Sequence, residues 1–151
     1  RYPALSATVC DLPTSRGYAE ENIAEHGVSD RISFFDLDYH SDEIKGRYDA
    51  AWLSHILHAE GPGSCLKILK KAVNATERGG KVLVHEFILN DTKDAPLFPT
   101  LFSLNMLVAT SSGRAYSEAE LREMMDSAGL KAINRLDYSG PNESGILEGR
   151  V

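Results

Sequence analysis

Four side chains that can do acid–base or polar binding chemistry stand at the ends of apolar runs. Asp11 closes one run and Asp38 follows a second. His58 comes just after a third run, and Glu86 lies near the end of a fourth. If these runs are parallel strands, their carboxyl ends meet at one edge of a sheet, where open α/β sheets bind ligands. The sequence therefore predicts one crevice lined by these four residues.

His58 is the candidate general base of this crevice. A histidine titrates near neutral pH and can take a proton from a hydroxyl within hydrogen-bond reach. Glu86 is the carboxylate inside its apolar run, and a buried charge without a partner is costly, so we expect it to be paired. His85 alternates to the opposite face of the strand, where we expect it to pack against a helix. The alternatives are a helix-capping role for His58 and a purely structural pair for Glu86.

Metal binding is the alternative chemistry for the residues around His58 and Glu86. Imidazole and carboxylate ligands occur together in His55, His58, His85 and Glu86. Their spacing matches no recognised metal motif, and we expect no metal. Cys10 and Cys65 are too few and too separated for a disulfide framework or a cysteine-based zinc site. We expect both to be reduced core residues, which fits a cytoplasmic protein.

Size and charge narrow the class of protein. The 151 residues suffice for one domain with a real core. The net charge of −6 argues against a nucleic-acid partner, which requires a concentrated basic face. No apolar run approaches the roughly 18 residues of a membrane span, so we expect no membrane partner.

The elements that position these residues alternate between strand and helix. Strands are expected at residues 7–12, 31–37, 48–57 and 81–89, with a helical turn over HILHAE (55–60) as the alternative for the end of the third. Helices are expected from Thr14 or Ser15 to Gly27, from a Ser64 cap to Gly79-Gly80, over residues 97–110, and after a capping box at Ser117. Residues 131–138 and 145–151 read as an antiparallel pair. The pattern predicts a doubly wound, Rossmann-like α/β fold whose mostly parallel sheet ends in a C-terminal antiparallel hairpin.

Six stretches carry a family resemblance across nearly the whole chain. They are VCDLP (9–13), RISFFDLDYH (31–40), YDAAWLSHILHAEGPGSCLKIL (48–69), GGKVLVHEFIL (79–89), LFSLNMLVATSSGRAYSEAEL (101–121) and SGILEGR (144–150). In this order they resemble the C-terminal catalytic domain of class I S-adenosylmethionine-dependent O-methyltransferases. The similarity is greatest to the plant caffeate and acetylserotonin O-methyltransferases and their bacterial relatives.

The resemblance implies S-adenosyl-L-methionine as the cofactor. Asp11, followed by Leu12, matches the acid that accepts both ribose hydroxyls; its alternative role is a plain helix cap. Asp38, with Leu37 and Tyr39, matches the acid and apolar cover beside the adenine; the alternatives are a solvated loop charge and competition from Asp36. Ser54 stands where the plant enzymes carry a lysine that touches the cofactor.

The resemblance also assigns the acceptor side of the crevice. His58 matches the family's catalytic histidine, which takes the proton from a hydroxyl of a small aromatic acceptor, and Glu86 matches the acid that orients it. Four residues at helical spacing match the acceptor pocket, although ordinary core packing explains them equally well: Phe98, Phe102, Asn105 and Met106. Ala59 and Ala115 replace acidic residues of the plant enzymes, so substrate specificity does not carry over.

Several family parts have no counterpart in residues 1–151. The glycine-rich cofactor loop would lie about ten residues before Arg1. The family's first strand and its N-terminal dimerisation domain are also missing, and that strand belongs between the strands ending at Asp11 and at Trp52–Ser54. We therefore interpret residues 1–151 as a partial catalytic domain of a longer protein, and expect that protein to be a homodimer through the missing domain.

Other functions remain open at this stage. A carbon- or nitrogen-directed methyltransferase of the same fold would leave His58 with less to do. A catalytically silent domain that binds the cofactor or serves as a scaffold would be consistent with Ala59 and Ala115. A nicotinamide dehydrogenase fits the terminal hairpin and the HILH block poorly.

Overall fold

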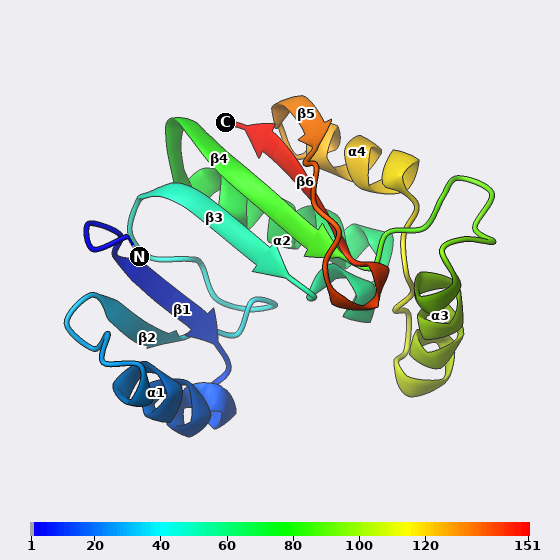
Figure 1. The fold of residues 1–151 in the computed structure, drawn as a ribbon. Coiled ribbons are helices and arrows are strands. Elements are labelled where there is room, and N and C mark those ends of the chain that lie inside the picture. Colours follow the sequence, from blue (N-terminus) through cyan, green and yellow to red (C-terminus); the bar gives the residue numbers. More distant parts are fainter. Residues whose placement is uncertain (1) are drawn as a thin grey trace. The chain divides into compact units, whose positions relative to one another are not determined.

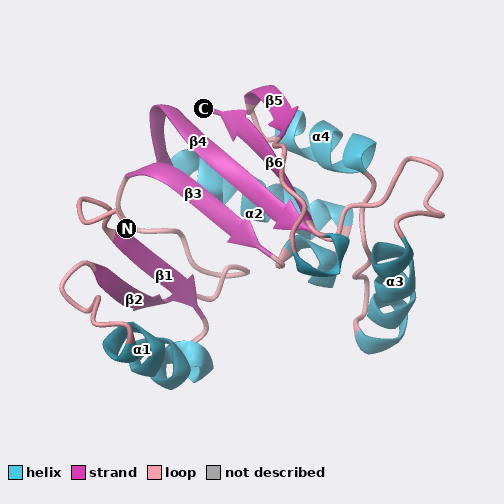
Figure 2. Cartoon of the chain, viewed as in Figure 1, coloured by secondary structure: helices cyan, strands magenta, loops and turns pink. Residues whose placement is uncertain are grey.

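The computed structural model describes residues 2–151. The chain divides into two compact units, Arg1–Ile44 and Lys45–Val151. Figure 1 traces the order of the elements along the chain, and Figure 2 separates helices, strands and loops. None of the helices in the described residues is long and apolar enough to span a bilayer.

The first unit is one strand–helix–strand crossover. β1 (Ala7–Asp11) and β2 (Ile32–Asp36) pair in parallel, from Ala7 opposite Ile32 to Asp11 opposite Asp36. Between them, a 3-10 turn η1 (Pro13–Ser15) leads into α1 (Arg16–Glu25). The parallel pairing brings the carboxyl ends of both strands to the same edge, as the sequence predicts.

The second unit is built on a four-stranded sheet in the order β3-β4-β6-β5. β3 (Tyr48–Ser54) and β4 (Thr76–Glu86) are parallel. β6 (Gly145–Arg150) is antiparallel to β4 and to β5 (Lys131–Arg135). The predicted mostly parallel α/β fold with a C-terminal antiparallel hairpin is confirmed.

Two helices supply most of the core against this sheet. α2 (Pro62–Ala75) lies behind β3 and β4 in Figure 1. Its buried residues recur at helical spacing, at positions 65, 68, 69 and 72, and so form one apolar face. α4 (Glu118–Ser127) begins at the predicted capping box, in which Ser117 and Glu120 each accept the other's backbone N–H.

α3 (Leu97–Ala109) stands apart from the sheet and contacts two 3-10 turns. These are η2 (Leu57–Ala59), which follows β3, and η3 (Pro141–Glu143). The Glu143 carboxylate accepts the backbone N–H of Phe98 at 2.9 Å. The same helix exposes a row of large apolar side chains: Leu97, Leu101, Leu104, Leu107 and Val108.

The predicted limits of α2 are wrong at both ends. The helix starts at Pro62 after Gly61, and Ser64 makes no cap, because proline already has the backbone angle of a first helical turn. The helix ends at Ala75, and Gly79-Gly80 lies inside β4. A Cβ on Gly80 would lie 2.7 Å from the Asp49 carbonyl oxygen, so this glycine lets β4 approach β3.

Other element ends are also shorter than predicted. β3 stops at Ser54, because His55 adopts a left-handed backbone with φ of 54°. β4 stops at Glu86 and β5 at Arg135, whereas the predicted strands run to residues 89 and 138. Ser15 precedes α1 but makes no side-chain cap. Among residues 2–151, β1 and β2 pair only with each other.

Candidate active site

His58 and Glu86 meet because they follow neighbouring parallel strands. Ser54 pairs with His85 in the register of β3 and β4, so the turn after β3 runs beside the end of β4. His58 lies in that turn, η2, and Glu86 is the last residue of β4. Val82, Val84 and Glu86 alternate with half-buried neighbours and are all buried, which places the carboxylate on a core-facing side of the strand.

The Glu86 carboxylate is buried and fully hydrogen-bonded. Its Oε2 atom accepts from His58 Nδ1 at 2.8 Å and from the Phe87 backbone N–H at 3.3 Å. Its Oε1 atom accepts the backbone N–H groups of Leu57 at 2.8 Å and of His58 at 3.3 Å. An ionised carboxylate only accepts hydrogen bonds, so the His58 proton sits on Nδ1. Nε2 of a neutral His58 therefore keeps its lone pair.

Aromatic rings line one side of His58. Phe102 meets the His58 ring edge-on, with 4.8 Å between centroids. Phe87 lies 4.6 Å from Phe102 and 5.0 Å from Phe98. α3 supplies Phe98 and Phe102, and β4 leads into Phe87. These contacts form an apolar wall beside the imidazole.

The four acceptor-side residues predicted on α3 therefore divide into two pairs. Phe98 and Phe102 join the aromatic cluster at His58. Asn105 is exposed and Met106 is half-buried, and neither belongs to the aromatic cluster. Sequence reasoning missed Phe87, although its position directly after Glu86 was an available signal.

His55 is a second imidazole at the same carboxylate. Its Nδ1 atom lies 3.9 Å from Glu86 Oε2. That nitrogen is buried and has no hydrogen-bond partner within residues 2–151. Burial lowers the pKa of His55 and so favours the neutral ring. The charge of Glu86 acts in the opposite direction but does not outweigh the burial.

His85 and Ser54 form a second polar contact at the ends of β4 and β3. Ser54 Oγ lies 3.4 Å from His85 Nδ1, and Ser144 Oγ lies 3.0 Å from His85 Nε2. The His85 ring also packs against the rings of His55, at 4.4 Å between centroids, Trp52 and Tyr138. The opposite-face prediction for His85 is confirmed, but packing against a helix is wrong, because strand and loop residues fill that position.

A buried thiol and a phenol donate hydrogen bonds to backbone carbonyl groups of the η2 turn and of the residue after it. Cys65 Sγ donates to the Leu57 carbonyl at 3.2 Å, and the Tyr116 hydroxyl donates to the Glu60 carbonyl. Burial raises the pKa of Cys65 to about 11 and also raises the pKa of Tyr116, so both groups stay protonated near neutral pH. Cys65 is thus a free core thiol as predicted, whereas Cys10 is only half-buried.

The predicted cofactor residues lie in the first unit, except for Ser54, which ends β3 in the second unit. Asp11 is exposed at the end of β1, and its Oδ1 atom accepts the Leu12 backbone N–H at 2.7 Å. The Asp11 carbonyl accepts the Leu37 N–H at 2.8 Å, so the residues after β2 lie beside the end of β1. Leu37 is buried, and Tyr39 packs on the His40 ring.

Asp36 and Asp38 have different partners. Asp36 forms an ion pair with Arg16 at 2.9 Å. Asp38 accepts the His40 backbone N–H at 2.9 Å, and this hydrogen bond lowers the pKa of its carboxyl. Asp38 is therefore ionised at neutral pH without an arginine occupying it, which favours it over Asp36 as a ligand-binding acid.

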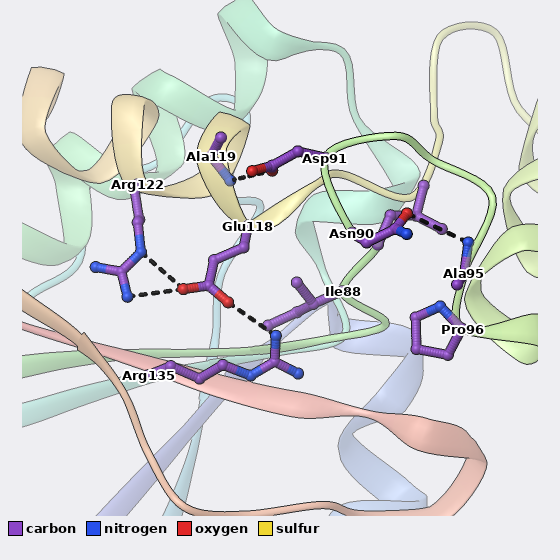
Figure 3. Close-up of a pocket in the computed structure, with 10 residues that line it drawn as sticks. Ile88, Asn90, Asp91, Ala95, Pro96, Glu118, Ala119, Arg122 and Arg135 are labelled. Carbon is purple, nitrogen blue, oxygen red and sulfur yellow. Dashed lines mark hydrogen bonds and ion pairs between the residues drawn. The ribbon is translucent and has the colours of Figure 1, made fainter.

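A pocket of about 440 Å³ lies elsewhere in the second unit (Figure 3). It is lined by the loop after β4, the start of α4 and Arg135. Glu118 accepts from Arg135 at 2.9 Å and pairs with Arg122 at 2.7 Å, so one carboxylate neutralises much of the positive charge. His55, His58 and Glu86 are not among its lining residues.

The parallel ladders, the crossover helices and the antiparallel final strand define a Rossmann-like α/β class, with a histidine–glutamate pair at its strand ends. The model of the O-methyltransferase domain family matches residues 1–131. The chain belongs to this family. The predicted family resemblance is confirmed.

Curated relatives and solved structures agree with this assignment. The chain is 36% identical over 149 residues to 3-hydroxy-5-methyl-1-naphthoate 3-O-methyltransferase of Streptomyces sahachiroi, covering 99% of the chain and 43% of the relative. It is 31% identical to L-tyrosine C(3)-methyltransferase of Streptomyces lavendulae, over 96% and 40% of the two chains. Human N-acetylserotonin methyltransferase in complex with SAM superposes with a TM-score of 0.86 at 26% identity, over 99% and 41%. The chain thus spans about two fifths of the length of these proteins.

Proposed function

We propose that the full-length protein transfers a methyl group from S-adenosyl-L-methionine to a hydroxyl of a small aromatic acceptor, with His58 as general base. The 2.8 Å hydrogen bond between His58 Nδ1 and Glu86 Oε2 carries this proposal. Family membership supports the reaction class. The naphthoate relative, whose name specifies methylation of an aromatic hydroxyl, supports the acceptor class.

His58 removes the hydroxyl proton in the proposed reaction. Because Glu86 holds the proton of the neutral ring on Nδ1, the lone pair of Nε2 is available to accept it. The ring then becomes an imidazolium, and the buried carboxylate stabilises its positive charge. When bound, S-adenosyl-L-methionine supplies a methyl group on a positively charged sulfur. The acceptor oxygen gains nucleophilicity as its proton moves to His58.

The aromatic wall suits an aromatic acceptor. Phe102, Phe98 and Phe87 present ring faces and edges beside the base. Rings in offset or edge-on contact gain about 0.5–1.5 kcal/mol beyond simple burial. Such contacts hold an acceptor ring near the imidazole and exclude water, and orientation of this kind accounts for much of the rate in a one-step transfer.

Two carboxylates of the first unit support the cofactor part of the proposal. Asp11 is exposed, and its Oδ2 atom has no partner within residues 2–151, which suits a pair of ribose hydroxyls. Asp38 is ionised and half-buried next to buried Leu37, which suits an amino group on an apolar ring. These residues fit S-adenosyl-L-methionine, and we propose that they hold its ribose and adenine ends.

Methylation of carbon is the second candidate, because one relative is named for methylating C3 of tyrosine. That carbon neighbours the carbon bearing the phenolic hydroxyl. Removal of the phenolic proton by His58 would activate the ring at this position as well as the oxygen. A product mass spectrum with fragmentation separates an O-methyl from a C-methyl product.

The test compares His58→Ala and His58→Gln with the wild type in the full-length protein. Calorimetry measures cofactor binding, and mass spectrometry measures turnover of a panel of phenols and naphthols. We expect turnover to fall by about 10²–10⁴ while cofactor affinity stays the same. His26→Ala is the matched control, since this exposed ring bonds only to its own helix. Unchanged turnover in the His58 variants would reject His58 as the general base. A wild-type protein that binds no cofactor would reject S-adenosyl-L-methionine-dependent methyl transfer.

A further inference from the structure

We propose that His55, His58 and Glu86 form a binding site for one divalent transition-metal ion of the zinc class. Each side chain offers one ligand atom, and these atoms lie within 4.8 Å of one another. Two imidazoles and a carboxylate are a common three-ligand set for zinc, with a water in the fourth position. The proposed methyl-transfer reaction does not use a metal, although this site shares His58 and Glu86 with it.

The distances are close to those around a bound ion. His58 Nδ1 lies 2.8 Å and His55 Nδ1 lies 3.9 Å from Glu86 Oε2. Bonds of about 2.0–2.2 Å to zinc place neighbouring ligand atoms roughly 3–3.5 Å apart. The His55 ring, which packs on the rings of His85 and Phe87, would have to move towards Glu86 and His58 to reach this spacing. Binding at His58 Nδ1 moves the proton of that neutral ring to Nε2.

His55 is the residue that points to a ligand. Its Nδ1 atom is buried and has no hydrogen-bond partner in the described part of the chain. Buried polar atoms are nearly always hydrogen-bonded, so an unpaired one needs an explanation. The ring is held there by a left-handed backbone, with φ of 54°, which is unfavourable for a residue with a Cβ. A metal ion would give this nitrogen a partner.

Charge and ligand type select the ion. The Glu86 side chain is 4% exposed, and its ion-pair contacts within residues 2–151 are the two histidines, with no lysine or arginine. A cation between them would balance a buried negative charge. Imidazole nitrogen suits zinc, nickel and copper, whereas magnesium and calcium prefer oxygen ligands. The His55 side chain is 32% exposed and gives the ion a route from solvent.

The consequence for activity rests on the proposed function. With a metal on Nδ1 and the proton on Nε2, His58 has no lone pair left to accept a hydroxyl proton. A bound zinc ion would therefore inhibit methyl transfer without displacing the cofactor or the acceptor.

The test is a Co²⁺ titration of the full-length protein, because cobalt replaces zinc and absorbs visible light when bound to protein ligands. We expect a ligand-field absorption that saturates at one ion per chain and is abolished by added Zn²⁺. His55→Gly removes the ring and suits the left-handed backbone, and His55→Gln keeps a side chain of similar size. Both should weaken Co²⁺ binding by at least about 10-fold, the loss seen even for outer-shell partners. His26→Gln should bind as the wild type does, and circular dichroism confirms the fold of each variant.

Two outcomes overturn the proposal: a wild type with no saturable cobalt spectrum, or folded His55 variants that bind cobalt as tightly as the wild type. A parallel activity assay should show zinc inhibition that weakens at least about 10-fold in His55→Gly. The cobalt spectrum does not depend on turnover. A protein that binds cobalt through His55 but transfers no methyl group would keep the metal site and reject the proposed function instead.

Discussion

Glu86 does two jobs with one carboxylate. One oxygen accepts the His58 ring nitrogen, and the other accepts backbone N–H groups of the turn that carries this ring. The orientation of the imidazole and the position of its backbone are therefore set by the same buried group. Hydrogen bonds to a charged group contribute about 1.5–3 kcal/mol each, so this residue matters for stability as well as for chemistry.

Replacement of Glu86 by glutamine separates these two effects. In the wild type both carboxylate oxygens accept from N–H donors. In either orientation of the glutamine amide, its NH₂ group would face some of these donors and leave them without an acceptor. We expect the free energy of unfolding to fall by about 1–3 kcal/mol. Where the amide NH₂ faces His58, the ring can bond to it only by placing its own proton on Nε2, so turnover should fall by about 10²–10⁴. Urea unfolding and the methyl-transfer assay measure the two effects.

Glu123→Gln is the control for that substitution, because Glu123 is exposed on α4. It should match the wild type in both measurements. A Glu86→Gln protein with wild-type stability and turnover would contradict the role of the carboxylate.

Sequence alone identified the histidine–glutamate pair but not its surroundings. His58 and Glu86 stand out because each is a polar residue at the end of an apolar run. Phe87 does not stand out in the same way, since an aromatic residue in an apolar run reads as core, and His55 stood out only as a possible metal ligand that was set aside. Their roles follow from a left-handed backbone at His55 and from the approach of α3, and neither is encoded in a local pattern.

At the scale of elements, the η2 turn is fixed from three directions. Glu86 holds its backbone N–H groups, and Cys65 and Tyr116 hold its carbonyl groups. Gly113 forms the third contact, because a Cβ there would collide with the His58 carbonyl oxygen and lie 2.9 Å from the Ala59 carbonyl carbon. The general base is thus carried by a turn that three other segments define.

Gly113→Ala tests this packing. The added methyl group must displace the η2 turn or the loop that carries Gly113, and overpacking of this kind costs about 1–3 kcal/mol. We expect a lower free energy of unfolding and a lower kcat/KM, measured by urea unfolding and steady-state kinetics. Gly63→Ala is the matched control, because this glycine lies in α2 with no atom within 4 Å of its added Cβ. Equal stability of the two variants would contradict the close contact at Gly113.

The start of α4 should make stability depend on acid pH. Burial by itself raises the pKa of Glu118, but hydrogen bonds from Arg135 and Arg122 outweigh it and hold the pKa below its usual value. A lowered folded-state pKa means that the stabilisation is complete above the unfolded value of about 4.3 and is lost as pH falls through the folded value. Unfolding measured from about pH 6 to about pH 3 should show Glu118→Gln losing less stability over this range than the wild type. Identical pH profiles would reject the contribution of Glu118.

Strand and helix types were predictable, whereas several ends were not. The capping box at Ser117 has a local sequence signature and is confirmed. The end of α2 has none: Thr76 turns to an extended backbone, and its hydroxyl donates to the Ala72 carbonyl, three residues before the first of the glycines that suggest a stop. Gly80 instead serves the contact between two strands, which is a tertiary requirement.

At the scale of the whole molecule, the core is distributed unequally between the two units. Leu37 is the buried apolar residue of the first unit within residues 2–44, and the rest of the buried core lies in the second unit. β1 and β2 form a two-stranded sheet, which is marginal by itself, while β3 to β6 form a four-stranded one. Resistance to local opening should therefore differ between the units.

Hydrogen exchange measured by mass spectrometry checks this difference. In the 151-residue chain, amides of β1 and β2 should exchange faster than those of β4, which is paired on both sides. Peptides from α1 and α2 serve as the matched helical comparison, since α1 has no buried residue and α2 has five. Equal protection of β1 and β4 would contradict the unequal core.

Parallel pairing within each unit was predictable from the apolar runs, and it is confirmed for β1 with β2 and for β3 with β4. The prediction that all four strand ends line one crevice concerns the arrangement of the two units, and it stays a prediction. Local sequence specifies which strand ends carry polar residues. The distance between separate sheets depends on long-range packing that no local pattern records.

The double attachment of Glu86 also bears on how such a site changes over generations. Loss of this carboxylate removes the anchor of the η2 backbone, so it is opposed by selection for folding alone. Replacement of the His58 ring leaves the backbone N–H groups of Leu57 and His58 bonded to Glu86. A lineage that abandoned catalysis would therefore lose the histidine first and keep the glutamate, and the histidine is the better marker of an active descendant.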